Sequence, residues 1–158
     1  APPFKSVTNY SRNKEEALSM TDQQLASLAL SMTERSYCPY SKFPVGAALL
    51  CADGQVFTGC NVENAAYGST ICAERTALVK AVSEGRRSGF TRLAVAGRGE
   101  EFCWPCGACR QMLYEFAPDL VVLAIRGDGQ FQSLPLRDLL PHGFGPEALG
   151  DVKRPGGI

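Results

Sequence analysis

The chain has 158 residues, 45% of them apolar, which is enough for one domain with its own core and too few for two. Sixteen basic residues balance sixteen acidic ones, so the net positive field that favours non-specific binding to nucleic acids or membranes is missing, and a small-molecule partner is favoured. The sequence contains no run of eighteen apolar residues, so it predicts no membrane span. The opening "APPFKSVTNYSRNKEEALSM" has no continuous apolar stretch typical of a signal peptide. We therefore expect a cytoplasmic protein.

The first elements predicted along the chain are an arm and a helix. Residues 1–20 are polar and contain prolines, and we interpret them as an N-terminal arm that precedes a single domain over residues 21–158. The segment "TDQQLASLALSM" opens with Thr21 and Gln24 at the spacing of a capping box and continues as an apolar stripe. This pattern predicts a helix.

The segment "VGAALLCADGQVFTGCNVE" predicts two strands joined at Asp53-Gly54. This dipeptide is favoured in hairpins in which both central positions take positive φ. Later segments predict, in chain order, a helix over 72–83 ended by Gly85, a buried strand over 91–97, a helix over 106–116, a buried strand over 120–125, a turn leading into 131–135 and a short helix over 136–140. This order of elements predicts an α/β protein with a mixed sheet and helices on both faces.

The segment "PCGACRQ", residues 105–111, places two cysteines three positions apart at the start of a predicted helix. The chain has seven cysteines, and an odd number in a protein expected to be intracellular disfavours a disulfide framework. Four interpretations of the pair remain open at this point: a redox pair, a structural zinc site, part of an iron–sulfur ligand set, and a catalytic metal site.

Three cysteines stand at two predicted helix starts, Cys72 at one and Cys106 and Cys109 at the other. The ends of neighbouring elements converge at ligand sites in α/β proteins, and the partial positive charge of helix N-termini favours thiolates. Three protein ligands leave a catalytic zinc one open position. Glu74 lies close enough in sequence to exchange protons with water held there.

Three thiolates on Zn²⁺ leave a net negative charge, which makes bound water a weaker acid unless positive charge lies nearby. Arg75 and Arg110 stand close to these cysteines in sequence and could supply that charge.

Other candidate ligands receive a different interpretation. Cys103 could close the zinc site as a fourth thiolate, although Pro105 is expected to turn it away from the helix start. The single histidine, His142, is interpreted as a surface or packing residue. The remaining cysteines have apolar neighbours and are interpreted as small core residues: Cys38, Cys51 and Cys60.

Five segments, in this order, resemble the zinc-dependent cytidine deaminases, in the small free-nucleoside branch of that family. They are "YCPYSKFPVGAALL" from Tyr37, "GCNVENAAYG" from Gly59, "CAERTA" from Cys72, "PCGACRQ" from Pro105 and "LLPHGFGPEAL" from Leu139. The resemblance implies a three-layer α/β/α fold with a mixed five-stranded sheet and one Zn²⁺ per chain. It also implies a homotetramer whose active sites are shared between subunits.

The resemblance assigns the central chemistry to four residues. It implies that Cys72, Cys106 and Cys109 are the zinc ligands and that Glu74 is the general acid and base. Trp104, directly before the "PCGAC" motif, is bulkier than the residue we expect there in the family.

The resemblance also implies a set of substrate-binding residues. Asn61 and Glu63 are implied to bind the ribose hydroxyls, and two residues at this spacing on a strand point to the same face. Phe43 is implied to pack near the pyrimidine ring, Ala73 to contact the substrate, and Phe144 to reach the site of a neighbouring subunit.

The implied activity is hydrolytic deamination of cytidine and 2'-deoxycytidine to uridine and 2'-deoxyuridine with release of ammonia, as in pyrimidine salvage. The expected route is attack of a zinc-bound hydroxide on the pyrimidine ring. Two alternatives remain open: a deaminase of another aminopyrimidine nucleoside such as blasticidin S, and a non-catalytic zinc-binding module closed by Cys103. A nucleotide or polynucleotide substrate is disfavoured because no cluster of basic residues is present to bind phosphate.

Overall fold

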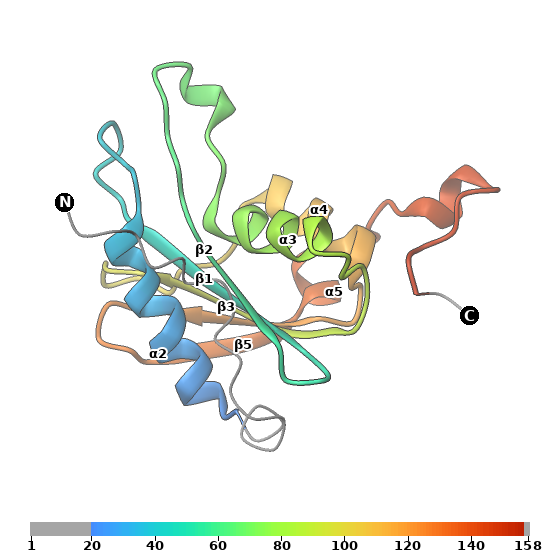
Figure 1. Cartoon of the computed structure of the whole chain (residues 1–158), viewed down its shortest axis with the longest axis horizontal. Helices are drawn as coiled ribbons and strands as arrows, with labels where there is room; N and C mark the ends of the chain where they lie inside the picture. The colour runs from blue at the N-terminus through green and yellow to red at the C-terminus, as the bar shows by residue number, and fades with distance from the viewer. Residues whose placement is uncertain (1–19, 157–158) are drawn as a thin grey trace.

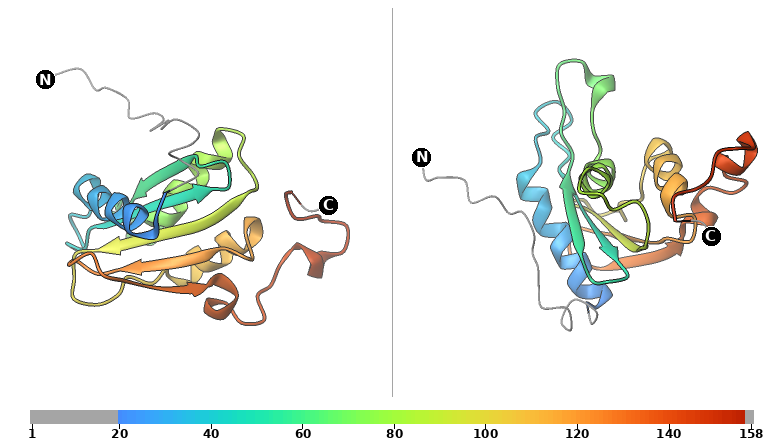
Figure 2. Two further views of the ribbon diagram at one scale, coloured as in Figure 1. Left: turned by 90° about the horizontal axis from the view of Figure 1, so that it is seen from below. Right: turned by 45° about the vertical axis from the view of Figure 1, so that its right-hand side comes forward.

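A computed structural model describes residues 20–156 of the chain, in which one sheet lies between helices on both of its faces (Figures 1 and 2). The predicted N-terminal arm, apart from Met20, lies outside the described residues. Within residues 20–156, no helix combines the length and the apolar character that crossing a membrane requires.

The sheet has five strands in the order β2-β1-β3-β4-β5. Only the pair β3 and β4 is parallel, and the other three pairs are antiparallel, which confirms the predicted mixed sheet. The strands are β1 (Val45–Cys51), β2 (Val56–Cys60), β3 (Phe90–Gly97), β4 (Val121–Ile125) and β5 (Phe131–Pro135).

The helices form the two outer layers, so the predicted three-layer α/β/α fold is confirmed (Figure 2). Of the helices within residues 20–156, only α2 (Asp22–Met32) packs on one face. The other face carries α3 (Ala73–Ser83), α4 (Gly107–Phe116) and α5 (Leu136–Leu139). The sequence did not predict three short 3₁₀ helices: Thr33–Arg35, Tyr67–Ser69 and Pro146–Leu149.

Two local predictions have different outcomes. The capping box is confirmed, because Thr21 N donates to Gln24 Oε1 at 2.9 Å and Gln24 N donates to Thr21 Oγ1 at 3.1 Å. The expected hairpin turn with two positive φ angles is wrong, because Gly54 has a φ of 85° and Asp53 keeps a negative one. Gly54 N donates to Cys51 O, as in a type I turn that is followed by a glycine in the left-handed region.

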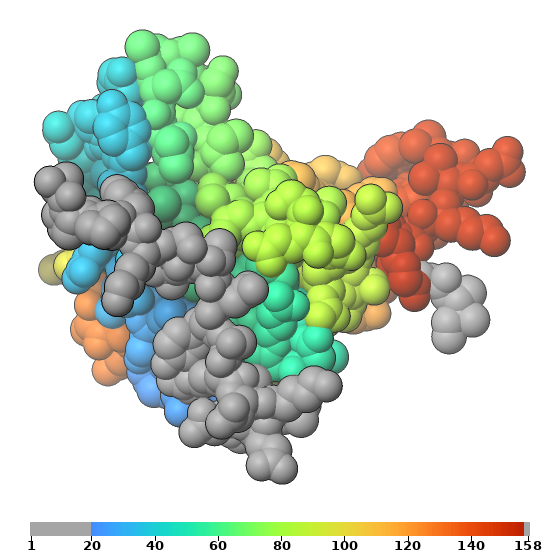
Figure 3. Space-filling view, viewed as in Figure 1, coloured from blue at the N-terminus to red at the C-terminus, as the bar shows by residue number. Residues whose placement is uncertain are grey.

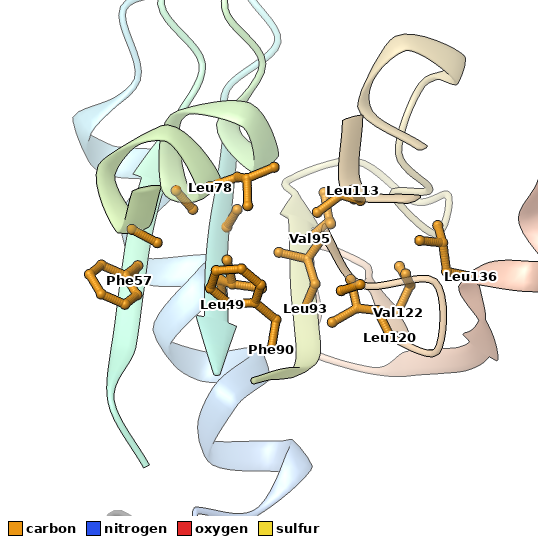
Figure 4. Packing of buried hydrophobic residues seen from close by; sticks show 14 of the residues in the cluster. Leu49, Phe57, Leu78, Phe90, Leu93, Val95, Leu113, Leu120, Val122 and Leu136 are labelled. Carbon is orange, nitrogen blue, oxygen red and sulfur yellow. The ribbon is translucent and has the colours of Figure 1, made fainter. Parts of the chain in front are cut away.

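The core consists of two layers because alternate residues of the central strands face opposite sides of the sheet. Leu49 and Leu93 face α3 and α4 within the larger layer (Figure 4), whereas Ala48 and Ala94 face α2. The side that faces α2 is built from smaller residues on β1 and β3. Helix α2 can therefore approach the sheet closely.

Two glycines mark where helices touch the sheet. A Cβ at Gly46 would lie 2.0 Å from the carbonyl oxygen of Ala29 on α2. A Cβ at Gly59 would lie 2.3 Å from the carbonyl oxygen of Ala73, the first residue of α3. Gly59 therefore sets the position of the N-terminus of α3.

We expect Gly59→Ala to lower the free energy of unfolding by at least ~1–3 kcal/mol, because the new methyl group must displace the backbone of α3. The measurement is the urea midpoint at constant m-value. Gly68→Ala is the matched control, since a Cβ at Gly68 meets no heavy atom within 4 Å. Equal midpoints for the two variants would contradict this account of the packing.

Candidate active site

Three thiols from two helices form a compact cluster. The sulfurs of Cys72, Cys106 and Cys109 all lie within 4.8 Å of one another, and the Sγ atoms of Cys72 and Cys106 are 3.8 Å apart. Thiolates bound tetrahedrally at ~2.3 Å from Zn²⁺ are separated by about 3.8 Å. The three predicted ligands therefore come together with a spacing that fits zinc, and soft sulfur donors favour zinc over magnesium or calcium.

The local sequence places these thiols at helix N-termini. Cys72 is the N-cap of α3 and Cys106 the N-cap of α4, both with extended backbone angles. Neither side chain makes the capping hydrogen bond that Ser, Thr, Asn or Asp would make at this position. The sulfurs thus remain free to bind metal, and Cys109 joins them from the first turn of α4.

Of the two arginines expected to offset the negative charge, Arg75 contacts a sulfur. Its Nη2 lies 3.5 Å from Cys72 Sγ and 3.1 Å from the carbonyl oxygen of Thr70. Arg110 instead donates to the carbonyl oxygens of Pro105 and Leu139, and so fastens the start of α4 to α5.

The thiols of the cluster differ in acidity. The pKa of Cys72 is lowered to about 5, first by a hydrogen bond from Cys109 and further by Arg75. The pKa of Cys109 is raised, because it donates that hydrogen bond and because it is buried. Of Cys72 and Cys109, Cys72 therefore provides a thiolate more readily.

Glu74 is a buried carboxyl group two residues after Cys72, and only 4% of it is exposed. Burial raises its pKa to about 7, and the negative charge of Cys72 adds to the shift. A carboxyl group with this pKa can both accept and release protons near neutral pH. This is the property that the predicted general acid and base requires.

The other candidate ligands lie outside the cluster. Cys103 is absent from the three-sulfur group and packs beside the core, where burial raises its pKa to about 12. His142 is exposed, as predicted. Cys51 is a core residue as predicted, but Cys38 and Cys60 are half-buried, so their prediction as core residues is wrong. Cys38 lies in the loop before β1, and Cys60 is the last residue of β2 and lies beside Arg35. Neither position belongs to the buried core.

Backbone pairing brings the predicted sugar-binding segment next to the cysteine cluster. Val62 exchanges two hydrogen bonds with Ile71, the residue before Cys72, at 2.9 and 3.0 Å. Val62 also forms a parallel bridge with Tyr37. This pairing holds Asn61 and Glu63, the two neighbours of Val62, close in space to Cys72.

The side chains of Asn61 and Glu63 are buried and bind the loop that precedes β1. The Asn61 amide accepts from Val45 N and from the Ser36 hydroxyl and donates to Phe43 O. The Glu63 carboxylate accepts from Tyr40 N, at 3.0 Å, and from the backbone N–H and hydroxyl of Ser41.

The sequence did not predict the roles of Ser36 and Ser41, whose hydroxyl groups donate hydrogen bonds to Asn61 and Glu63. Burial by itself would raise the pKa of Glu63, but the hydrogen bonds from Ser41 and Tyr40 outweigh it and lower the pKa. Glu63 is thus held ionised. Ser41 lies within the segment "PYSKFPVG" that the family resemblance covers, so that segment was the available signal.

The remaining predicted residues are more scattered. Phe43 is 49% exposed, and its ring lies 3.2 Å from the position of a Cβ on Gly97, at the end of β3. Ala73 is the first residue of α3, where the helix has no internal acceptor for its N–H. Phe144 lies on the segment after α5, which projects from the body (Figure 1), and Trp104 packs beside the core.

Fold and site define a zinc-binding α/β protein in which three thiolates would hold the ion, with a buried carboxyl group two residues after the first of them. Residues 19–125 match the family model described as the cytidine and deoxycytidylate deaminase zinc-binding region. The chain belongs to this family of zinc-dependent deaminases, as the resemblance predicted.

Individual relatives agree with that family. The cytidine deaminase of Halalkalibacterium halodurans is 47% identical over 133 residues, which cover 84% of this chain and 100% of the relative. A crystal structure of cytidine deaminase from Burkholderia pseudomallei has a TM-score of 0.77 and 46% identity, and covers 79% of this chain and 100% of its own. The cytidine deaminase structure from Mycobacterium tuberculosis has a TM-score of 0.69 and 39% identity, and covers 80% of this chain and 99% of its own.

Proposed function

We propose that this protein catalyses the hydrolytic deamination of cytidine and 2'-deoxycytidine to uridine and 2'-deoxyuridine. The observation that carries the proposal is the cluster of Cys72, Cys106 and Cys109 with the buried Glu74 beside it, in a chain of the deaminase family. We also infer that residues 21–158 act as one catalytic domain.

The three cysteines would hold one Zn²⁺ per chain, and Arg75 would offset part of the charge of the thiolates. A zinc ion with one open position acidifies water and so supplies a nucleophile at neutral pH. The positive ends of α3 and α4 lower the cost of gathering three anionic sulfurs.

Glu74 moves the protons of the reaction. It accepts a proton from the attacking water and delivers it to ring N3 while the water oxygen bonds to C4, which becomes tetrahedral. It then carries the second proton from the new hydroxyl group to the amino group. The C4–N4 bond breaks, ammonia leaves and uridine remains. The raised pKa of Glu74 suits a group that must take up and release a proton within each cycle.

Substrate recognition is assigned to residues around the cluster. Asn61 and Glu63 would bind the sugar hydroxyls, Phe43 would pack against the pyrimidine ring, and the N–H of Ala73 would face the substrate. The exposed Phe144 would complete the site of a neighbouring subunit in a homotetramer. With 59% of Phe144 exposed in the single chain, its ring is accessible to a second copy.

The test is the ultraviolet absorbance change of cytidine on addition of the zinc-loaded protein. We expect conversion of cytidine and of 2'-deoxycytidine to the uracil nucleosides. Conversion of blasticidin S without conversion of cytidine would show that the protein is a deaminase of another aminopyrimidine nucleoside with the same reaction mechanism. A protein that binds zinc, converts none of the three and has no exchangeable water on the metal would be the closed zinc-binding module.

Glu63→Ala is expected to raise the KM for cytidine by about 10- to 100-fold, because a hydrogen bond to a charged group contributes roughly 1.5–3 kcal/mol. Part of the effect would come from Tyr40 and Ser41, which lose their acceptor. Steady-state kinetics provide the measurement, and Glu84→Ala, at an exposed helix end, is the control. Unchanged KM and kcat would remove Glu63 from the sugar site.

A further inference from the structure

The segment after α5, residues 140–156, projects from one side of the molecule and contacts α4 where it leaves it (Figures 1 and 3). Three large apolar side chains on it are widely exposed: Phe144 at 59%, Leu149 at 63% and Val152 at 50%. Exposed apolar side chains contribute little to the stability of the chain that carries them. The segment nevertheless has a defined shape, and its contacts with α4 explain why.

Arg154 makes most of these contacts, with only 13% of its side chain exposed. Its Nε and Nη2 each donate to a carboxylate oxygen of Glu147 at 2.9 Å, in a two-pronged ion pair within the tail. Its Nη1 donates to the carbonyl oxygens of Tyr114 and Glu115 on α4, at 3.1 Å for Glu115. The guanidinium also lies 4.8 Å from the centre of the Tyr114 ring.

The tail backbone around Phe144 packs on the same tyrosine. A Cβ at Gly143 would lie 2.9 Å from the ring of Tyr114, and a Cβ at Gly145 would lie 2.6 Å from Arg154 Nη2. Gln111 of α4 donates to the carbonyl oxygen of Phe144 at 2.8 Å. The residues on both sides of Phe144 are thus fixed against α4, while its ring remains exposed.

We propose that Arg154 is a positioning residue, which together with Glu147 fixes the tail on α4 so that Phe144 is presented to the substrate pocket of a second copy of this chain. This inference rests on the proposed function. Fixing the backbone on both sides of Phe144 before association reduces the entropy that is lost when the two copies meet. The ion pair lies inside the tail, so it shapes the tail without touching the substrate.

The test compares cytidine kinetics of Arg154→Ala, Phe144→Ala and the double variant. Each single variant is expected to raise KM by about two- to tenfold, which is the range of one aromatic contact, with kcat changed less than about twofold. The double variant should have the KM of Phe144→Ala, since an absent ring needs no positioning. Arg137→Ala is the matched control, because Arg137 lies 6.0 Å from the same tyrosine ring but pairs with Asp119.

Glu147→Gln is the second variant in case Arg154→Ala does not fold, and it should raise KM in the same direction. If Phe144→Ala raises KM and Arg154→Ala does not, the inference about Arg154 is overturned, whereas the role of Phe144 remains. Multiplied effects in the double variant would overturn it too, because the two residues would then act independently. An unchanged KM for Phe144→Ala would overturn it together with the proposed shared site, whereas a wild-type protein without cytidine turnover would mark the failure of the proposed function.

Discussion

Glu74→Gln is expected to lower kcat for cytidine by more than about 10⁴-fold, beyond the usual contribution of general acid–base catalysis, because one carboxyl group serves every proton transfer. Glutamine has nearly the same shape, so it can occupy the buried position of Glu74 without opening a cavity. An amide, however, neither accepts the proton of the attacking water nor delivers one to N3. The loss should therefore appear in kcat rather than in folding.

The measurement pairs single-turnover kinetics with zinc content. Zinc content should stay at one ion per chain, because Cys72, Cys106 and Cys109 remain in place. Glu84→Gln, at an exposed position at the end of the same helix, should behave as the unmodified protein. Near-normal turnover by zinc-loaded Glu74→Gln would show that another group moves the protons.

Much of the fold was predictable because its signals are local. Thr21 and Gln24 form their capping box within one helical turn, and the apolar runs of β3 and β4 are typical of strands buried on both faces. The turn at Asp53-Gly54 was predicted in the right place with the wrong geometry. A dipeptide favours a turn, whereas the register of the flanking strands decides which residues take positive φ.

The candidate site was predictable where helix starts determine it and hidden where distant segments meet. The predicted helix starts at Cys72 and Cys106 are confirmed, since each cysteine is the N-cap of its helix. The hydrogen-bond partners of Glu63, Tyr40 and Ser41, lie more than twenty residues earlier in a loop. Arg154 contacts Tyr114, which lies forty residues earlier in the sequence. Such contacts depend on how irregular backbone closes over the sheet, and no periodic pattern in the sequence encodes that closure.

Cys109→Ser is expected to remove both zinc and activity. Cys109 is fully buried, and a neutral hydroxyl in its place is a much weaker zinc ligand than a thiolate. Two sulfurs would remain, and zinc content should fall from one ion per chain to less than about a tenth, since ligation by a full set of protein ligands contributes on the order of 10 kcal/mol. Metal analysis after dialysis and the cytidine absorbance assay measure the two losses.

Cys103→Ser is the matched substitution, because it changes a cysteine of the same "CWPCGAC" run that lies outside the three-sulfur cluster. The Cys103 side chain packs against the core instead of joining the three sulfurs. We therefore expect this variant to keep its zinc and its turnover. Loss of zinc from Cys103→Ser as well would mean a centre closed by four thiolates, and such a centre has no open position for the water that deamination consumes.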